Sequence, residues 1–292
     1  MQVVNLLIDE SFAYTKKKES MAVRRDEIGE LMNITAYCQN EAVKEPLEYQ
    51  DTLWETYVQE GITFMEWLYG SGDGSEEDRR RLLEAISKKE MTASDRDLAV
   101  AESSDMKKIS VALGEFPLCV SDVEGYVERR REILSSIRNV KEYEAFMQSC
   151  FTNSCFAVGI LAEMKHIADF SERTKEITKA LGILNDKAVE LYREYSDNLE
   201  EAMHILSTLL HRDCAPDPKH GKELIFSFTY SEQMEGKSAA KTKDVECSPH
   251  LKLLHGGSNL RIYFYWCDEV IGSGEKVLVG RIGRHPYKKK GK

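Results

Sequence analysis

The sequence has few residues that interrupt regular structure and no long apolar run. Only six prolines occur in 292 residues. No window reaches the roughly 18 uncharged apolar residues that a membrane helix needs. The start, Met1 to Glu10, has no basic segment before its short apolar run, which argues against a signal peptide. With 42% hydrophobic and 31% charged residues, the composition is that of a globular, non-membrane protein.

Several signatures of well-known chemistry are also missing. Seven cysteines is an odd number, and their wide spread predicts reduced thiols in a cytoplasmic protein. The chain lacks a phosphate-binding glycine loop, a serine nucleophile elbow and the His-Glu signature of zinc proteases. These absences disfavour nucleotide hydrolysis and classical proteolysis, and we expect no cofactor.

Charge is unevenly distributed along the chain. Residues 211–292 hold 15 Lys and Arg against 10 Asp and Glu, a balance of +5, whereas residues 1–210 have a balance of −15. The basic part also holds five of the seven histidines. Such asymmetry indicates two roles in one chain and favours nucleic acid as a partner of the basic end.

Apolar spacings of three, four and seven residues predict that the first 210 residues are mainly helical, with one or two short strands. The expected helices are 19–42, 52–69, 75–89, one that starts at the Ser121 to Glu124 capping box, and three or four between 140 and 210. Breaks are expected at 151–154, at 169–171 and around Gly182. The runs 3–8 and 107–113 predict two strands.

The pattern changes after residue 210. Two prolines and a glycine within 211–221 predict a linker over 211–222. The short branched and aromatic runs that follow predict strands 224–230, 260–266 and 276–282, the last two joined as a hairpin, and the polar stretch 231–244 predicts a loop. We therefore expect an α+β protein: an acidic helical domain (1–210), the linker, and a basic domain with a small antiparallel sheet (223–292).

The predicted hairpin concentrates basic and aromatic side chains. Alternation places Arg261, Tyr263 and Tyr265 on one face of a strand, and Ile262, Phe264 and Trp266 on the other. Arginine, histidine and tyrosine side chains can bind RNA phosphate, stack on a base, and donate or accept a proton near neutral pH. The residues expected to act in catalysis are Arg261, Arg281, Arg284, His285 and Tyr287. Those expected to bind nucleic acid are Lys252, Tyr263, Tyr265, Lys288, Lys289 and Lys290.

An arginine-led aromatic strand, a glycine turn and a closing strand that ends in arginine and histidine resemble the last two strands of RelE-type ribonuclease toxins. The resemblance covers about 30 residues, Leu260 to Tyr287. It implies catalysis by basic side chains that stabilise phosphate charge, with a terminal tyrosine or histidine. This chain departs from those toxins in the roughly 210 residues that precede the match, where they have a short helical pair.

The same residues are open to two alternative interpretations. The terminal arginines and lysines can form a solvated basic rim, with Tyr263 and Tyr265 packed against helices. Alternatively, Cys214, His220, Cys247 and His250 can be the four ligands of a structural zinc ion, because the two-residue spacing of Cys247 and His250 allows both to reach one tetrahedral ion.

The charge distribution and the hairpin together predict a bacterial cytoplasmic effector, of the toxin or anti-phage kind, that acts on RNA as a metal-independent endoribonuclease. A non-catalytic adaptor is the alternative, with acidic helices that bind a partner protein and a basic tail that holds nucleic acid. A purely structural role for the basic tail is the third hypothesis. The sequence predicts no membrane partner and leaves the oligomeric state open.

Overall fold

The computed structural model describes residues 4–5, 21–40, 43, 48–50, 54–55, 57–59, 61–70, 77, 80, 90–92, 111–113, 116–120, 122–217, 223–234, 237–253 and 259–285. The fold is mixed α+β, with most helices N-terminal to most strands, as the sequence predicts. The chain divides into two compact units, Met1–Arg130 and Arg131–Lys292. No helix of the described part is long and apolar enough to cross a membrane.

The first unit contains helices and several very short strands. Its elements are β1 (Val4–Asn5), α1 (Met21–Gln39), β2 (Glu48–Gln50), β3 (Tyr57–Gln59), β4 (Ile62–Thr63), α2 (Phe64–Tyr69), β5 (Glu90–Thr92), β6 (Val111–Leu113), β7 (Phe116–Val120) and the start of α4 (Val123–Ser136). β1 pairs with β6 in antiparallel fashion, which confirms the two predicted strands where they are described. Most of the helix predicted at 75–89 lies outside the described residues.

The single helix predicted over 52–69 is wrong. Gly61 has a φ of +79° and turns β3 into β4, and α2 begins only after Thr63. Thr63 accepts a hydrogen bond from the Glu66 N–H, and the Glu66 carboxylate accepts one from the Thr63 N–H, a reciprocal cap that starts a new helix. The left-handed turn at Gly61 and the cap at Thr63 together interrupt the helix that the apolar spacing predicts.

The second unit is built on a five-stranded sheet. After the rest of α4, its elements are α5 (Val140–Cys150), β8 (Ser154–Phe156), α6 (Ile160–Met164), α7 (Phe170–Glu194), α8 (Leu199–Leu210), β9 (Cys214–Ala215), β10 (Ile225–Met234), β11 (Lys237–Glu246), β12 (His250–Lys252), β13 (Leu260–Tyr265), the 3₁₀ turn η4 (Gly272–Gly274) and β14 (Val277–Arg284). The strand order is β8-β14-β13-β12-β9, and β10 and β11 form a separate two-stranded ribbon. The β13–β14 hairpin is confirmed.

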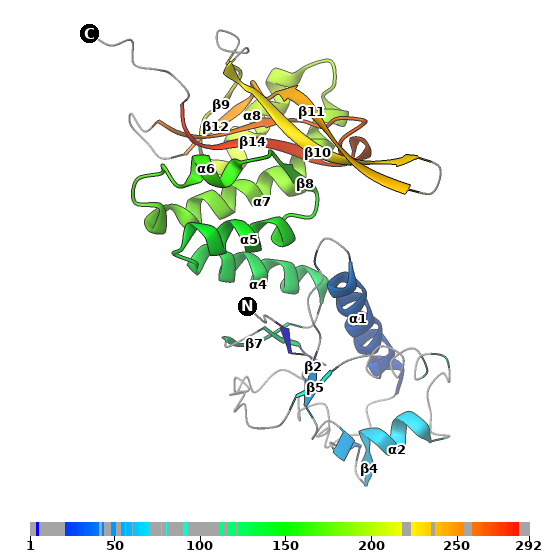
Figure 1. Cartoon of the computed structure of the whole chain (residues 1–292). Coiled ribbons are helices and arrows are strands. Elements are labelled where there is room, and N and C mark those ends of the chain that lie inside the picture. The colour runs from blue at the N-terminus through cyan, green and yellow to red at the C-terminus, as the bar shows by residue number, and fades with distance from the viewer. Residues whose placement is uncertain are drawn as a thin grey trace, which may run out of the picture. The chain divides into compact units, whose positions relative to one another are not determined.

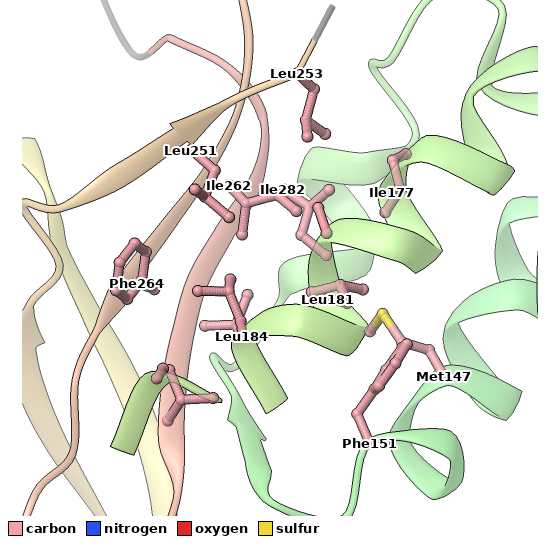
Figure 2. Close-up of a cluster of buried hydrophobic side chains, with 14 of the residues drawn as sticks. Met147, Phe151, Ile177, Leu181, Leu184, Leu251, Leu253, Ile262, Phe264 and Ile282 are labelled. Atoms are coloured by element: carbon pink, nitrogen blue, oxygen red, sulfur yellow. The ribbon is translucent and has the colours of Figure 1, made fainter. Parts of the chain in front are cut away.

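One core joins the helices to one face of this sheet. Ile177, Leu181 and Leu184 of α7 recur every three or four residues and pack with strand residues such as Ile262 and Phe264 (Figure 2). Figure 1 shows α5 and α7 on one side of the sheet and the β10–β11 ribbon on the other. On the ribbon side, Tyr263 packs with ribbon residues in a second, smaller core. The predicted alternation of residues 261–266 is therefore confirmed.

The division of the second unit differs from the predicted boundary at 211–222. β8 lies on the N-terminal side of that boundary and pairs in parallel with β14, and β9 lies within the predicted linker yet forms an edge of the sheet. The apolar stripes of α5, α7 and α8 need a partner surface, and the sheet supplies it. Helices and strands thus share one core instead of forming two domains.

Two smaller predictions also fail. The stretch 231–244 is not a loop, because β10 and β11 pair over ten residues each. The described residues of 231–242 are mostly exposed, so their sequence lacks the polar–apolar alternation of a half-buried strand, whereas Phe226 to Tyr230 of β10 do alternate and confirm the predicted strand 224–230. The break expected at Gly182 is absent, since α7 runs through it. The break at 151–154 is confirmed, and β8 begins there.

Candidate functional site

Two rows of residues on the ribbon side of the sheet form the candidate site. His250 of β12 pairs with Tyr263 of β13, and Tyr263 pairs with Arg281 of β14. In the next row, Lys252 pairs with Arg261. Residues directly opposite each other on neighbouring antiparallel strands point to the same face. The register therefore places two arginines, a histidine and a tyrosine together, on the face opposite α7.

His285 completes this group with a carboxylate from the predicted linker. Its Nε2 lies 2.9 Å from Oδ2 of Asp217, and both side chains are nearly buried, with exposed fractions of 4% and 10%. The His285 ring meets the Tyr263 ring edge-on at 6.0 Å between centroids. The Asp217 N–H donates to Oγ of Ser248, which holds the carboxylate in place. We call Asp217, His250, Arg261, Tyr263, Arg281 and His285 the Arg–His cluster.

His250 lies on another side of the Tyr263 ring, with 5.1 Å between the ring centroids. It is buried, with 5% of its surface exposed. Burial lowers the pKa of His250 to about 4, and the positive charge of Arg261 acts in the same direction, whereas the Ser248 backbone and Asp217 oppose the shift. The imidazole is therefore neutral at neutral pH, when it has one donor and one acceptor nitrogen.

The two arginines of the cluster differ in their partners. Nη2 of Arg281 is 2.7 Å from Oε2 of Glu163 on α6, while its Nε is buried without a hydrogen bond. Arg261 is half-buried, and its Nε and Nη1 are buried without a hydrogen bond. Lys252, beside Arg261, pairs with Asp213 at 3.0 Å. Guanidinium groups with N–H donors that make no hydrogen bond are suited to binding phosphate oxygens.

The structure does not bring every predicted residue into the cluster. Arg284 pairs with Leu260, which packs in the core shared with the helices, so Arg284 lies on the opposite face and is exposed. Tyr265 packs against the ribbon core, and burial raises the pKa of its hydroxyl. Tyr287 and Lys288 to Lys290 lie outside the described residues.

The described members of the predicted zinc set do not all lie on one face of the sheet. Cys214 pairs with Leu251 and packs against the helix-side core, whereas His250, one residue earlier than Leu251, faces the ribbon side. Cys214 and His250 therefore lie on opposite faces of the sheet. His220 is outside the described residues, and none of the His, Cys, Asp and Glu within the described ranges form a group of three or more placed to hold a metal ion.

The sequence does not predict the roles of two members of the cluster, Asp217 and His250. Asp217 lies in a proline-rich stretch that is typical of a linker, and nothing in its local sequence indicates a pairing with His285, 68 positions later. The sequence predicts His250 only as a zinc ligand. Both roles depend on tertiary contacts, which the local sequence does not contain. His250 does give one local signal of a special role, because it is a polar residue among otherwise apolar strands.

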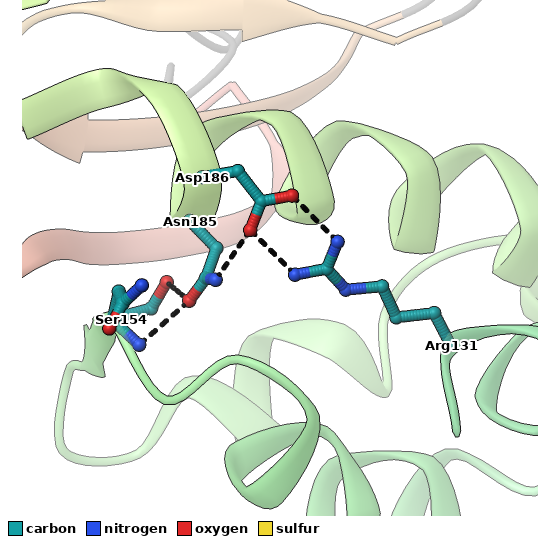
Figure 3. A network of polar contacts seen from close by, with 5 residues as sticks. Arg131, Ser154, Asn185 and Asp186 are labelled. Atoms are coloured by element: carbon teal, nitrogen blue, oxygen red, sulfur yellow. Dashed lines mark hydrogen bonds and ion pairs between the residues drawn. The ribbon is translucent and has the colours of Figure 1, made fainter. Parts of the chain in front are cut away.

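A second polar feature lies between α7 and the start of β8. Figure 3 shows Asn185 accepting hydrogen bonds from the Asn153 N–H and from Oγ of Ser154, at 2.9 and 3.0 Å, and donating to Asp186. Both terminal nitrogens of Arg131 bind the same carboxylate at 2.7 Å. Burial raises the pKa of Asp186, but the hydrogen bonds from Arg131 and Asn185 more than offset this and lower it overall.

This network borders a groove of about 520 Å³ that is rich in carboxylates. The groove is lined by Asn153, Asn185, Asp186, Val189, Glu190, Arg193, Glu194 and Glu275. Its two arginine–carboxylate pairs, Arg131–Asp186 and Arg193–Glu275, tie α4 and η4 to α7. Both pairs are made within the protein, so the polar residues of the groove help to hold α7 against its neighbours.

The chain matches no protein-family model, and comparisons with curated proteins and with solved structures find no match either. The likeness to RelE-type toxins therefore stays a resemblance of the sequence alone. Function has to be argued from the Arg–His cluster itself.

Proposed function

We propose that this protein binds RNA at the Arg–His cluster and cleaves it without a metal ion, as a cytoplasmic effector of the toxin or antiviral-defence kind. The proposal is supported by one observation above all. Arg261, Arg281 and the His285–Asp217 pair lie on the same face of the sheet, around Tyr263. Cationic donors beside a carboxylate-held histidine can catalyse phosphodiester cleavage, through charge stabilisation and proton transfer.

RNA supplies its own nucleophile, the ribose 2′-oxygen, and this determines which steps the protein has to catalyse. The ribose 2′-oxygen attacks the adjacent phosphorus, the bond from phosphorus to the 5′-oxygen breaks, and a proton leaves the 2′-hydroxyl while another reaches the 5′-oxygen. Asp217 orients His285 and stabilises its protonated form, so that this ring can accept the proton of the 2′-hydroxyl while water protonates the leaving 5′-oxygen. Arg261 and Arg281 stabilise the charge that develops on the phosphate oxygens.

We expect residues around the cluster to contact the sugar–phosphate backbone of a longer RNA. Lys252 lies in the same row as Arg261, and Lys288 to Lys290 follow the end of β14 in the sequence. Each phosphate that a lysine or arginine neutralises releases counterions and makes binding weaker as salt rises. We expect RNA affinity to fall steeply between low and physiological salt.

The test is incubation of the purified protein with total RNA and, separately, with DNA, with and without EDTA, followed by mapping of the cut ends. We expect cuts in RNA that EDTA does not prevent and that leave a 2′,3′-cyclic phosphate and a 5′-hydroxyl. DNA should stay intact because it has no 2′-hydroxyl. Cleavage of DNA at a similar rate, or cuts that EDTA abolishes, would contradict the proposal.

A matched pair of variants assigns the activity to the cluster. Loss of a proton-transfer group costs about 100-fold or more in rate, which we expect for His285→Gln. His204→Gln is the control, since His204 is exposed on α8 and outside the cluster, and it should cut like the parent. A melting curve checks that both variants fold. Equal rates for the two variants would remove His285 from the mechanism.

A non-catalytic adaptor is the second candidate, and the charge of the two compact units favours it. Residues 1–130 hold 16 Lys and Arg against 27 Asp and Glu, a balance of −11, whereas residues 131–292 hold 24 against 23. An acidic unit is suited to a basic partner protein. RNA binding that weakens with salt and yields no cut product in the same assay would support the adaptor instead.

A further inference from the structure

Arg261 is the cation of the cluster whose charge no described carboxylate balances. The neighbouring charges form pairs: Lys252 with Asp213 at 3.0 Å, Arg281 with Glu163 at 2.7 Å, and His285 with Asp217 at 2.9 Å. Among the residues that the structure describes, none forms an ion pair with Arg261. Its Nε and Nη1 are nevertheless buried and donate no hydrogen bond.

His250 has the same unusual combination of burial and missing partners. Only 5% of its surface is exposed, and neither ring nitrogen makes a hydrogen bond of good geometry, although the Ser248 backbone lies near enough to favour the protonated ring. Arg261 is close enough to act on the charge of the ring. The register supports this proximity, because His250 and Arg261 lie on neighbouring strands and on the same face, one row apart.

Buried polar groups without partners are costly. The cost is greater if the group is charged, and native proteins leave few such groups unpaired. A further buried donor, Nε of Arg281, lies on the same face. Arg261, His250 and Arg281 have unmet hydrogen-bonding capacity and point to the same face, where positive charge is in excess. An anion bound there would satisfy these groups.

We propose that Arg261 and His250, assisted by Nε of Arg281, form a binding site for one phosphate group. Arg261 provides the charge and N–H donors that suit two phosphate oxygens, and the neutral imidazole donates one further hydrogen bond. Asp217 is a carboxylate that acts on the charge of His250, and its pairing with His285 reduces its repulsion of an anion. The site does not depend on RNA cleavage and exists whether or not the protein is a ribonuclease.

The direct experiment follows phosphate binding at His250 in the intact chain. Protein labelled with ¹⁵N in its seven histidines is titrated with inorganic phosphate, and the ring nitrogens are observed by NMR. Bound phosphate should shift the His250 signals saturably and raise the pH at which the ring becomes protonated. His250 signals that do not respond to phosphate would overturn the proposal, without the need for any variant.

Two variants assign the donors by calorimetry. Arg261→Met should lower phosphate affinity more than tenfold, and His250→Phe, which keeps a flat ring but removes both nitrogens, should lower it several-fold. Arg193→Met is the control, because Arg193 pairs with Glu275 in the carboxylate-rich groove and not in the cluster. Unchanged affinity in Arg261→Met, or an equal loss in Arg193→Met, would place the anion elsewhere.

Three probes then distinguish the source of the phosphate: inorganic phosphate, uridine 5′-monophosphate, and a 2′-O-methylated dinucleotide that cannot be cleaved. Tighter binding of the dinucleotide indicates an internal phosphodiester, and tighter binding of the monophosphate indicates a terminal phosphate. Failure of all three to bind in an Arg261-dependent way would overturn the site. A chain that binds phosphate here but cuts no RNA would refute the proposed function and leave this site standing.

Discussion

His250 shows how one buried side chain can set the response of the whole fold to pH. Its neutral form is held in the folded protein, with a pKa of about 4, because burial and the charge of Arg261 disfavour the imidazolium ion. In the unfolded chain the ring titrates near 6.5. Between these two values the unfolded state binds more protons than the folded state, so acidification favours unfolding.

We therefore expect the free energy of unfolding to fall by about 2 kcal/mol between pH 7.5 and pH 5 through His250 alone. Urea unfolding at the two pH values measures this difference. His250→Phe should have a smaller loss on acidification than the parent, by about the same amount, because its side chain cannot titrate. An identical pH dependence in parent and variant would show that His250 is already charged or accessible in the folded state.

At the scale of one element, β14 contributes to both faces of the sheet. Val277, Val279 and Ile282 pack with the helices, while Leu278 packs with the ribbon. A bulge between Val279 and Arg281, opposite Tyr263 and Phe264, leaves Gly280 against the ribbon. A Cβ built on Gly280 would lie 2.4 Å from the Phe226 ring and 2.9 Å from Sγ of Cys247. Glycine at this bulge thus permits the ribbon to approach the sheet.

Replacement of Gly280 by alanine should destabilise the protein by about 1–3 kcal/mol, because the half-buried Phe226 ring and the buried Cys247 thiol cannot move aside freely. Gly283→Ala on the same strand is the control, since its nearest neighbours would be 3.6 Å away, an ordinary contact distance. Thermal melts of the two variants give the comparison. Equal stability would mean that the ribbon shifts easily over the sheet.

The ribbon is held by backbone pairing and polar contacts as well as by burial. Ten residues of β10 pair with ten of β11, and Ser227 binds Asp244 across the strands at 2.5 Å. Lys243 binds Asp268 at 2.6 Å, which fastens the ribbon to the turn after β13. The cores on the two faces of β14 are therefore linked through short polar contacts as well as through apolar packing.

At the scale of the whole molecule, the second unit has one core that draws on helices and strands far apart in sequence. Met147 and Phe151 lie in the same cluster as Leu251 and Ile282 (Figure 2). A basic C-terminal part without its helices would expose that entire apolar face. The unit should consequently fold only when both parts are present.

A fragment of residues 122–292, which keeps α4 whole, should fold and melt cooperatively. A fragment of residues 211–292 should show no cooperative transition, because Leu251, Ile262 and Phe264 lose their helical partners. Circular dichroism melts of both fragments, with the full chain as reference, test this. A cooperative melt of the shorter fragment would favour the domain boundary at 211–222 predicted from the sequence.

Much of the local structure could be predicted because it follows from periodicity. The alternation of residues 261–266 assigns each side chain to the correct face, since successive residues of a strand point to opposite sides. The spacing in α7 likewise predicts its apolar stripe. The sequence predicts only the first half of β10, as the strand 224–230, because there Phe226, Phe228 and Tyr230 alternate with exposed residues. The described residues of 231–242 are mostly exposed, so this part of the ribbon has no alternation for a pattern to detect.

Residue order alone was enough for the fold class, the charge contrast between the two ends, the closing hairpin and the group of basic and aromatic residues on it. Tertiary packing was needed to establish that β8 joins the sheet, that Arg284 lies away from Arg261, that His250 lies beside Tyr263 and that Asp217 pairs with His285. Periodicity is a local property that neighbouring residues share. Which distant residues meet depends on how all apolar faces are buried at once, and no short window of sequence contains that information.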